Sequence, residues 1–235
     1  MGGMDTETIT RPADAQAAPV TSRALARPAR GAIVPIREIG ARQREQIARH
    51  LAGLEPRDRY LRFGYAANDR QIGHYVDCLN FERDRVFGIF SRDLELVAVA
   101  HLAYPGVAAP SGLAEFGVSV SGHVRGRGYG SRLFQRAAIH AVNDGIKTLY
   151  IHALSENIAM LRIASNAGAV VERMGSESEA HLALPQASLR TRLNELMHGQ
   201  MGRIDYLLKA EASLARDVLA SVRGTAGKGR DKAGA

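Results

Sequence analysis

The sequence has no tryptophan and a single cysteine, Cys78, among its 235 residues. One thiol excludes an internal disulfide framework and a cysteine-based metal cluster, and it is typical of a reducing compartment. Cys78 stands among Tyr75, Val76 and Leu79 in a segment with helical spacing, so we expect a buried structural thiol rather than a nucleophile. Aromatic residues make up only 6% of the chain, so Leu, Ile, Val and Ala must supply most of the core.

The sequence also lacks a long apolar run and any metal-binding spacing. No segment approaches the roughly 20 apolar residues that a helix needs to cross a bilayer, and residues 1–30 contain no uninterrupted apolar stretch of the signal-peptide kind. The eight histidines and the one cysteine nowhere show the spacing of a zinc site. We therefore expect a cytoplasmic protein without a membrane partner and without a bound metal.

The formal net charge is +7, and part of the excess lies at the C-terminal end, in residues 222–235. There Arg223, Lys228, Arg230 and Lys232 face only one acidic residue, Asp231. A basic tail can attract nucleic acid, but a short segment rich in Gly and Ala is more often simply solvated. We expect a disordered basic tail, and nucleic acid remains the least favoured partner.

Residues 1–30 are rich in Ala, Pro, Thr and Arg and show no sustained period, which predicts a disordered N-terminal segment. Residues 31–185 instead alternate between strand-like and helical periodicity. Helices are predicted at 42–54, 69–79 (capped by Asn68), 133–142 and 156–167, and strands at 85–90, 94–102, 113–120, 148–154, 169–173 and 180–184. This order indicates one α/β domain with a central mixed β-sheet flanked by helices.

Residues 186–221 predict a long amphipathic helix after this domain. Its apolar face comprises Leu189, Leu193, Leu196, Met197, Met201, Ile204, Leu207 and Leu208, and Gly199 and Gly202 are candidate kink positions. A helix with an apolar face of this length usually packs against its own domain, and we expect the same here. Pairing with a second copy of the chain, as a homodimer, is the alternative.

A glycine-rich turn between a predicted strand and a predicted helix is the most informative local pattern. It runs from Val118 to Ser131 and contains glycines at 126, 128 and 130. Such glycines let the backbone turn tightly and bring several N–H groups to one point. The following helix adds its free N–H groups and the positive end of its dipole. The turn therefore predicts a phosphate or pyrophosphate site.

Two common phosphate motifs do not fit this turn. A dinucleotide site requires Gly-x-Gly-x-x-Gly after the first strand, with an acidic residue about 20 positions further on. Here the third glycine comes one residue early, the turn is in mid-chain, and the next strand ends without an acid. A nucleotide-triphosphate loop requires Gly-Lys followed by Ser or Thr, which is absent. The pattern therefore indicates a pyrophosphate site of another family.

The stretch resembles the acyl-CoA-binding motif of GNAT acetyltransferases, Gln/Arg-x-x-Gly-x-Gly/Ala, which Arg125, Gly128 and Gly130 fill. The next elements resemble the family as well, because a strand is followed by a helix that begins near Asn157 and ends with Gly168. The resemblance covers residues 82–184 and is strongest over 113–170. It implies a GNAT-like α/β fold with acetyl-CoA or another acyl-CoA as co-substrate.

The resemblance also implies roles for individual residues. Backbone amides of the turn would hold the CoA pyrophosphate, and the preceding strand would pair with the pantetheine arm and polarise the acyl carbonyl through an N–H near Val120. Asn157 would bind the pantetheine portion by hydrogen bonds. The implied cofactor-binding set is Val118, Ser119, Val120, Arg125, Gly126, Arg127, Gly128, Tyr129, Gly130, Ser131 and Asn157.

Catalytic groups are harder to assign. Many family members carry a proton-donating Tyr seven residues after the helix-opening Asn, but this sequence has Ala164 there. Glu115 lies near the position where some members keep a catalytic Glu, although an ordinary charged strand residue explains it equally well. His152 and Glu156, at the end of the next strand, are alternatives because the cleft should open there. Glu115 and His152 are therefore the candidate bases.

The segment from Arg57 to Phe63 is dense in charged and aromatic residues. Arg59 or Arg62 could hold an acidic group of a substrate in a bidentate manner, although a surface helix with its own ion pairs has the same composition. The segment resembles that of bacterial GNAT proteins related to the acetyltransferase domain of protein-lysine acetyltransferases, which hints at protein acceptors.

The leading hypothesis is a metal-free N-acyltransferase that moves an acetyl or other short acyl group from acyl-CoA to a primary amine of a small molecule or a protein lysine. A non-catalytic acyl-CoA sensor or interaction module is the alternative, motivated by Ala164 and by the long terminal helix. The acceptor itself is not encoded in any motif.

Overall fold

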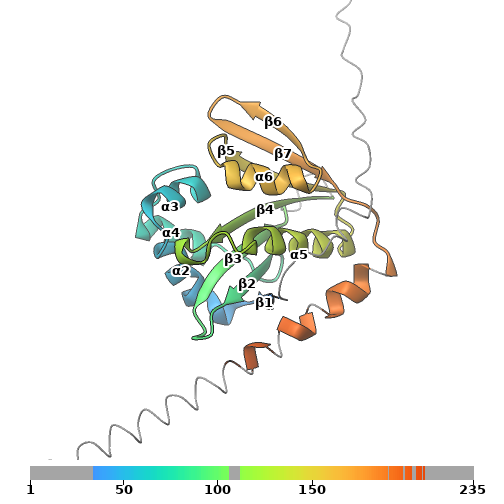
Figure 1. Ribbon diagram of the computed structural model, residues 1–235, viewed down its shortest axis with the longest axis horizontal. Coiled ribbons are helices and arrows are strands. Elements are labelled where there is room, and N and C mark those ends of the chain that lie inside the picture. Colours follow the sequence, from blue (N-terminus) through green and yellow to red (C-terminus); the bar gives the residue numbers. More distant parts are fainter. Residues whose placement is uncertain are drawn as a thin grey trace, which may run out of the picture.

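The computed structural model describes residues 34–105, 112–189, 191–197, 199–202, 205–207 and 209. Within them the chain forms a seven-stranded sheet in the order β1-β2-β3-β4-β5-β7-β6 (Figure 1). All neighbours are antiparallel except β4 and β5, which run parallel. The predicted mixed sheet is therefore confirmed. The segments 1–30 and 222–235, predicted to be disordered, lie outside the described residues.

The strands lie close to the predicted ones, and one short N-terminal strand was not predicted. The bounds are β1 Arg37–Ile39, β2 Arg85–Phe90, β3 Leu96–Ala103, β4 Leu113–Val120, β5 Thr148–Leu154, β6 Val170–Met174 and β7 Glu177–Ala183. Strand β1 has only three residues, so the alternation of apolar and polar side chains along it is too short to be recognised in the sequence.

The helices also lie close to the predicted ones, and Asn68 caps α4 through a reciprocal bond pair with Gln71. The charged segment that begins at Arg57 forms a further helix, α3. The bounds are η1 Ala41–Gln43, α2 Arg44–Ala52, α3 Pro56–Phe63, α4 Asp69–Asp77, η2 Gly122–Val124, α5 Tyr129–Asn143 and α6 Ile158–Asn166.

Two cores form on opposite faces of the sheet because side chains alternate along each strand. In β3, Ala100 and Leu102 pack in the core beneath α5, where the rings of Phe116 and Phe134 meet edge to face at 5.0 Å. Val99 points the other way, into the core formed with α2 and α4. Figure 1 shows α5 crossing the strands and α2, α3 and α4 grouped together.

The parallel ladder between β4 and β5 is short. It pairs Leu113 with Thr148, Ala114 with Leu149 and Glu115 with Tyr150, although β4 continues to Val120 and β5 to Leu154. On its other side β4 remains paired with β3 as far as Val120. The two parallel strands therefore separate toward their C-terminal ends.

The expectation for Cys78 was wrong, because its side chain is exposed. Helix α4 buries Ile72 and Val76. Successive residues of a helix differ by about 100° in direction, so Cys78, two positions after Val76, points away from the buried face.

The expected packing of the C-terminal helix was also wrong. Residues 189, 191–197, 199–202, 205–207 and 209 are helical, but the predicted apolar face points outward: Leu189, Leu193, Leu196, Met197, Met201 and Leu207 are exposed. The predicted residues beyond 209, together with Ile204 and Leu208, lie outside the described ones.

A polar face of this helix makes the contact with the domain instead. Glu195 binds Arg136 at 3.1 Å and also His140 of α5, and these hydrogen bonds, with that from Asn143, outweigh burial and lower the pKa of Glu195 to about 2. Gly202 is a contact position, since a Cβ there would lie 2.2 Å from the carbonyl oxygen of Ile36.

A buried histidine joins α2 to the sheet. His50 is only 6% exposed; its Nδ1 lies 2.9 Å from the carbonyl oxygen of Leu96 and its Nε2 2.9 Å from Oγ of Ser119. Only a protonated nitrogen can donate to a carbonyl, so Nδ1 carries the proton and Nε2 accepts from the Ser119 hydroxyl. Burial lowers the pKa of His50 to about 4, and the ring is neutral at pH 7.

This histidine makes the stability of the protein depend on pH. The unfolded chain protonates His50 below about pH 6.5 while the folded chain does not, so stability is lost as the pH falls toward 4. We expect the wild type to lose about 2 kcal/mol of unfolding free energy between pH 7 and pH 5 through this residue. Between the same two pH values, urea denaturation should show that His50→Gln loses about 2 kcal/mol less unfolding free energy than the wild type.

The exposed His74 provides the matched control. His74→Gln should keep the wild-type pH dependence, because it removes an exposed histidine and leaves the buried His50 in place. An unchanged pH dependence in His50→Gln would contradict the assigned neutral ring.

Candidate active site

A cavity of about 480 Å³ opens where β4 and β5 separate. Its wall is formed by α3 with Leu54 of the preceding loop, the end of β4, the turn before α5 with the start of α5, and α6 with its cap. Its lining is Leu54, Asp58, Leu61, Arg62, Val118, Ser119, Val120, Val124, Arg125, Gly126, Gly128, Tyr129, Gly130, Ser131, Asn157, Ala159, Met160, Arg162, Ile163 and Asn166.

The glycine-rich turn has the geometry of an anion site. Gly126 and Gly128 have φ angles of +75° and +76°, a region that other residues rarely adopt. The bond from the N–H of Arg132 to the carbonyl of Gly128 is 3.1 Å long and begins the helical ladder of α5. The N–H groups of Tyr129, Gly130 and Ser131 precede this ladder, so they are donors for a ligand at the positive end of the helix.

The backbone of β4 directs two further donors into the gap between the strands. The N–H of Ser121 bonds to the carbonyl of Val97 on β3 at 2.9 Å. Hydrogen-bonding direction alternates along a strand, so the N–H groups of Val118 and Val120 point away from β3. Since the pairing with β5 ends at Glu115, these groups face the cavity side.

Helix α3 forms one side of the cavity and contacts two others, the glycine-rich turn and the start of α6. Asp58 forms an ion pair with Arg125 of the turn, and Arg57 pairs with Glu156 at 3.2 Å, just before α6. Only the second pair is highly exposed on both sides, so the pair between Asp58 and Arg125 is the stronger tie.

Asn157 stands at the same edge and makes two contacts. Its Oδ1 accepts from the N–H of Met160 at 3.1 Å and so caps α6. Its Nδ2 donates to the carbonyl of Leu61 on α3 at 3.3 Å. The side chain is therefore fixed by its own helix on one side and bridges to α3 on the other.

Another wall of the cavity carries a hydroxyl group, that of Ser119, which is hydrogen-bonded to His50. Ser119 lines the cavity, and its hydroxyl is committed as a donor to His50 Nε2. Its oxygen therefore keeps lone pairs that can accept from a ligand N–H. The role of His50 behind Ser119 was not predicted, because no local pattern links residues 69 positions apart.

The structure places the two candidate bases away from the cavity. Glu115 is exposed on β4 before the strands separate, and His152 is exposed on β5 and pairs with Glu177 at 3.4 Å. Neither side chain lines the cavity. Burial, the hydrogen bond that the Tyr150 hydroxyl donates to Glu179 and the nearby charges of Glu179 and Glu115 raise the pKa of Tyr150 to about 12 on this face of the sheet.

Most of the predicted cofactor-binding residues line the cavity together. Arg127 is the exception, since it is exposed and outside the lining. Ala164, the position of the family's Tyr, is fully buried in the core and offers no proton donor. Of the two arginines of α3, Arg59 bonds to Asp69 at 2.6 Å and to the carbonyl of Leu54, whereas Arg62 lines the cavity.

In the described part of the chain no group of three His, Cys, Asp or Glu side chains is arranged to bind a metal ion. Nor does any described helix have the length and apolarity to cross a membrane.

Solved structures share this architecture at low sequence identity. The GNAT domain of PAT from S. lividans matches with a TM-score of 0.54 and 20% identity, over 63% of this chain and 89% of that one. yncA from Salmonella typhimurium, solved with acetyl-CoA, matches with a TM-score of 0.52 and 15% identity, over 67% and 97%. A phosphinothricin acetyltransferase from Sinorhizobium meliloti in complex with AcCoA matches with a TM-score of 0.53 and 12% identity, over 64% and 88%.

No curated protein sequence matches the chain significantly. The model of the acetyltransferase (GNAT) family, however, matches residues 46–168, which is more than half of the chain and spans α3, the strand separation, the glycine turn and α6. The fold, the cavity and this match agree, and the chain belongs to the GNAT acetyltransferase family.

Proposed function

We propose that the protein is an N-acyltransferase that moves an acetyl or other short acyl group from acyl-CoA to a primary amine of a small molecule or a protein lysine. The observation that carries the proposal is a single cavity that joins a phosphate-type turn to the unpaired end of β4. An acyl-CoA carries its thioester at the end of a long phosphorylated arm, so its binding needs a phosphate site and a free strand edge in one cavity.

The donor would be held by backbone groups. The N–H groups of Tyr129 to Ser131 and the Arg125 side chain would bind the pyrophosphate. The pantetheine arm would pair with the free edge of β4 at Val118 and Val120 in the manner of an added strand. The N–H of Val120 would then lie near the acyl carbonyl and polarise it.

Transfer is a direct displacement in this arrangement. The neutral amine nitrogen attacks the thioester carbonyl carbon, the N–C bond forms and the C–S bond breaks; the nitrogen releases one proton to water, and the thiolate that leaves takes one proton from water. The enzyme's contribution would be positioning and polarisation. The Ser119 hydroxyl donates its proton in the hydrogen bond to His50 Nε2, so its oxygen would orient the amine by accepting a hydrogen bond from one amine N–H.

Gly128→Glu tests the donor site, because it places a carboxylate among the amides that would hold the pyrophosphate. We expect the wild type to bind acetyl-CoA near micromolar affinity in a calorimetric titration and Gly128→Glu to lose this binding.

Gly128→Ala is the matched control, since it strains the same left-handed position without adding charge. It should bind acetyl-CoA more tightly than Gly128→Glu. Absence of acetyl-CoA binding by the folded wild type, and of binding to longer acyl-CoAs, would refute the proposal. Binding without turnover across a broad amine panel would instead favour a non-catalytic acyl-CoA sensor.

Ser119→Ala tests the acceptor side. Removing one hydrogen bond costs about 1.4 kcal/mol, or about tenfold in rate. We expect kcat/KM for the amine to fall about tenfold with acetyl-CoA affinity unchanged, measured by thiol release and by calorimetry. Equal losses in amine turnover and acetyl-CoA binding would show that Ser119 only supports the fold.

A further inference from the structure

Arg62 lines the cavity on the side of Ser119 rather than on the side of the phosphate turn. Its guanidinium lies over Gly117, where a Cβ would stand 2.8 Å from one terminal nitrogen and 3.0 Å from Cζ. Gly117 and Ser119 are two positions apart in β4, so both face the same side of the sheet, about 7 Å apart along the strand. Glycine at 117 therefore makes room for a guanidinium beside the reaction centre.

No acidic side chain in the described part of the chain pairs with Arg62. Asp58 pairs with Arg125 and Asp69 pairs with Arg59, but no ion pair within the described residues includes Arg62. Its Nε is buried and has no hydrogen-bond partner there. The remaining contacts are one hydrogen bond to Tyr75 and two aromatic rings near its Cζ.

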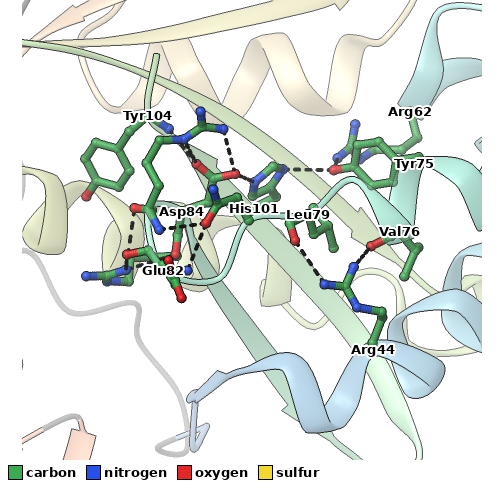
Figure 2. Close-up of polar contacts among 12 residues, drawn as sticks. Arg44, Arg62, Tyr75, Val76, Leu79, Glu82, Asp84, His101 and Tyr104 are labelled. Atoms are coloured by element: carbon green, nitrogen blue, oxygen red, sulfur yellow. Dashed lines mark hydrogen bonds and ion pairs between the residues drawn. The ribbon is translucent and has the colours of Figure 1, made fainter. Parts of the chain in front are cut away.

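A chain of hydrogen bonds holds this guanidinium in place (Figure 2). A terminal nitrogen of Arg62 donates to the hydroxyl of Tyr75 at 2.8 Å. That hydroxyl lies 2.9 Å from Nδ1 of His101, whose Nε2 lies 3.1 Å from a carboxylate oxygen of Asp84. An arginine only donates and a carboxylate only accepts, so Arg62 donates to Tyr75 and Nε2 of His101 donates to Asp84; in a neutral imidazole Nδ1 then accepts from the Tyr75 hydroxyl.

Asp84 anchors the chain as a buried anion. Its side chain is 4% exposed. Burial alone would raise its pKa, but hydrogen bonds from His101, Arg83 and the N–H of Tyr104 hold the pKa well below the usual range. The carboxylate is therefore charged across the neutral pH range. It fixes a proton of His101 on Nε2, which in the neutral ring leaves Nδ1 as the acceptor for Tyr75.

We propose that Arg62 recognises a carboxylate of the acceptor, so that the substrate is a primary amine that also carries a carboxylate. This inference rests on the proposed acyl transfer. An unpaired, half-buried guanidinium binds a carboxylate strongly because both partners are charged and the fork matches two oxygens. Tyr75 and His101 are positioning residues for Arg62, and Asp84 fixes the orientation of the chain.

Matched acid and amide probes isolate the carboxylate. The pairs are glycine and glycinamide, β-alanine and β-alaninamide, and 4-aminobutanoate and 4-aminobutanamide, which vary the distance between the amine and the anion. Binding to the CoA-saturated protein is measured by calorimetry, and turnover with acetyl-CoA is measured by thiol release. We expect at least one acid to bind at least tenfold more tightly than its amide, and to be acetylated with the higher kcat/KM.

Variants assign this preference to Arg62. Arg62→Ala should bring the ratio of acid to amide affinity close to one, and Gly117→Ala should lower it because the added methyl displaces the guanidinium. Arg49→Ala is the matched control, since it removes an exposed arginine of α2 that lies outside the cavity. It should keep the wild-type ratio.

Tyr75→Phe separates positioning from folding, because it keeps the ring and removes only the hydroxyl. We expect the KM for the acid to rise about threefold or more with acetyl-CoA affinity unchanged. A loss of acetyl-CoA binding in the same variant would instead indicate a merely structural role.

The outcomes distinguish the two proposals. Failure of the wild type to bind any acyl-CoA refutes the acyltransferase function. Binding of acetyl-CoA with equal affinity for acids and amides, or with no acid bound at all, refutes the role of Arg62 and leaves the acyltransferase proposal standing. A tenfold preference that survives in Arg62→Ala refutes it as well.

Discussion

Between β4 and β5 the parallel ladder covers three residue pairs, and then the strands separate. Backbone N–H and C=O groups in a protein interior need partners, so a sheet that splits in its middle must supply them from elsewhere or present them to a ligand. Here β4 keeps its bonds to β3 on one edge up to Val120 and presents the other edge to the cavity. The positions of the glycine turn, of α3 and of α6 all follow from this separation.

Much of this architecture could be predicted from the sequence because its signals are local. The strand from 113 to 120, the turn with glycines at 126, 128 and 130, and the helices after them each depend on period or on turn chemistry within a few residues. The phosphate-type turn is of this kind. Its positive φ angles at Gly126 and Gly128 are what the glycines in the sequence indicated.

The rest of the site depends on contacts between distant positions. His50 meets Ser119, and Tyr75 meets His101 and Arg62, although no periodicity relates them. Glu115 was chosen because it lies near the position of a catalytic Glu in some family members, and His152 because it is a histidine near a strand end, but sequence does not show where a cavity opens beside a strand. The C-terminal helix was misjudged for a related reason: the half-buried carboxylate of Glu195 contacts three residues of α5, so a polar face of the helix packs inward.

The ion pair between Asp58 and Arg125 gives the cavity an internal competitor. The protein's own carboxylate occupies the arginine of the phosphate-type turn, so any ligand that reaches this arginine must displace it. An anionic ligand exchanges one negative partner for another and keeps the arginine neutralised, whereas a neutral ligand leaves a charge without compensation. Because Asp58 belongs to α3, an anion that replaced its carboxylate on Arg125 would also break one of the contacts between α3 and the glycine-rich turn.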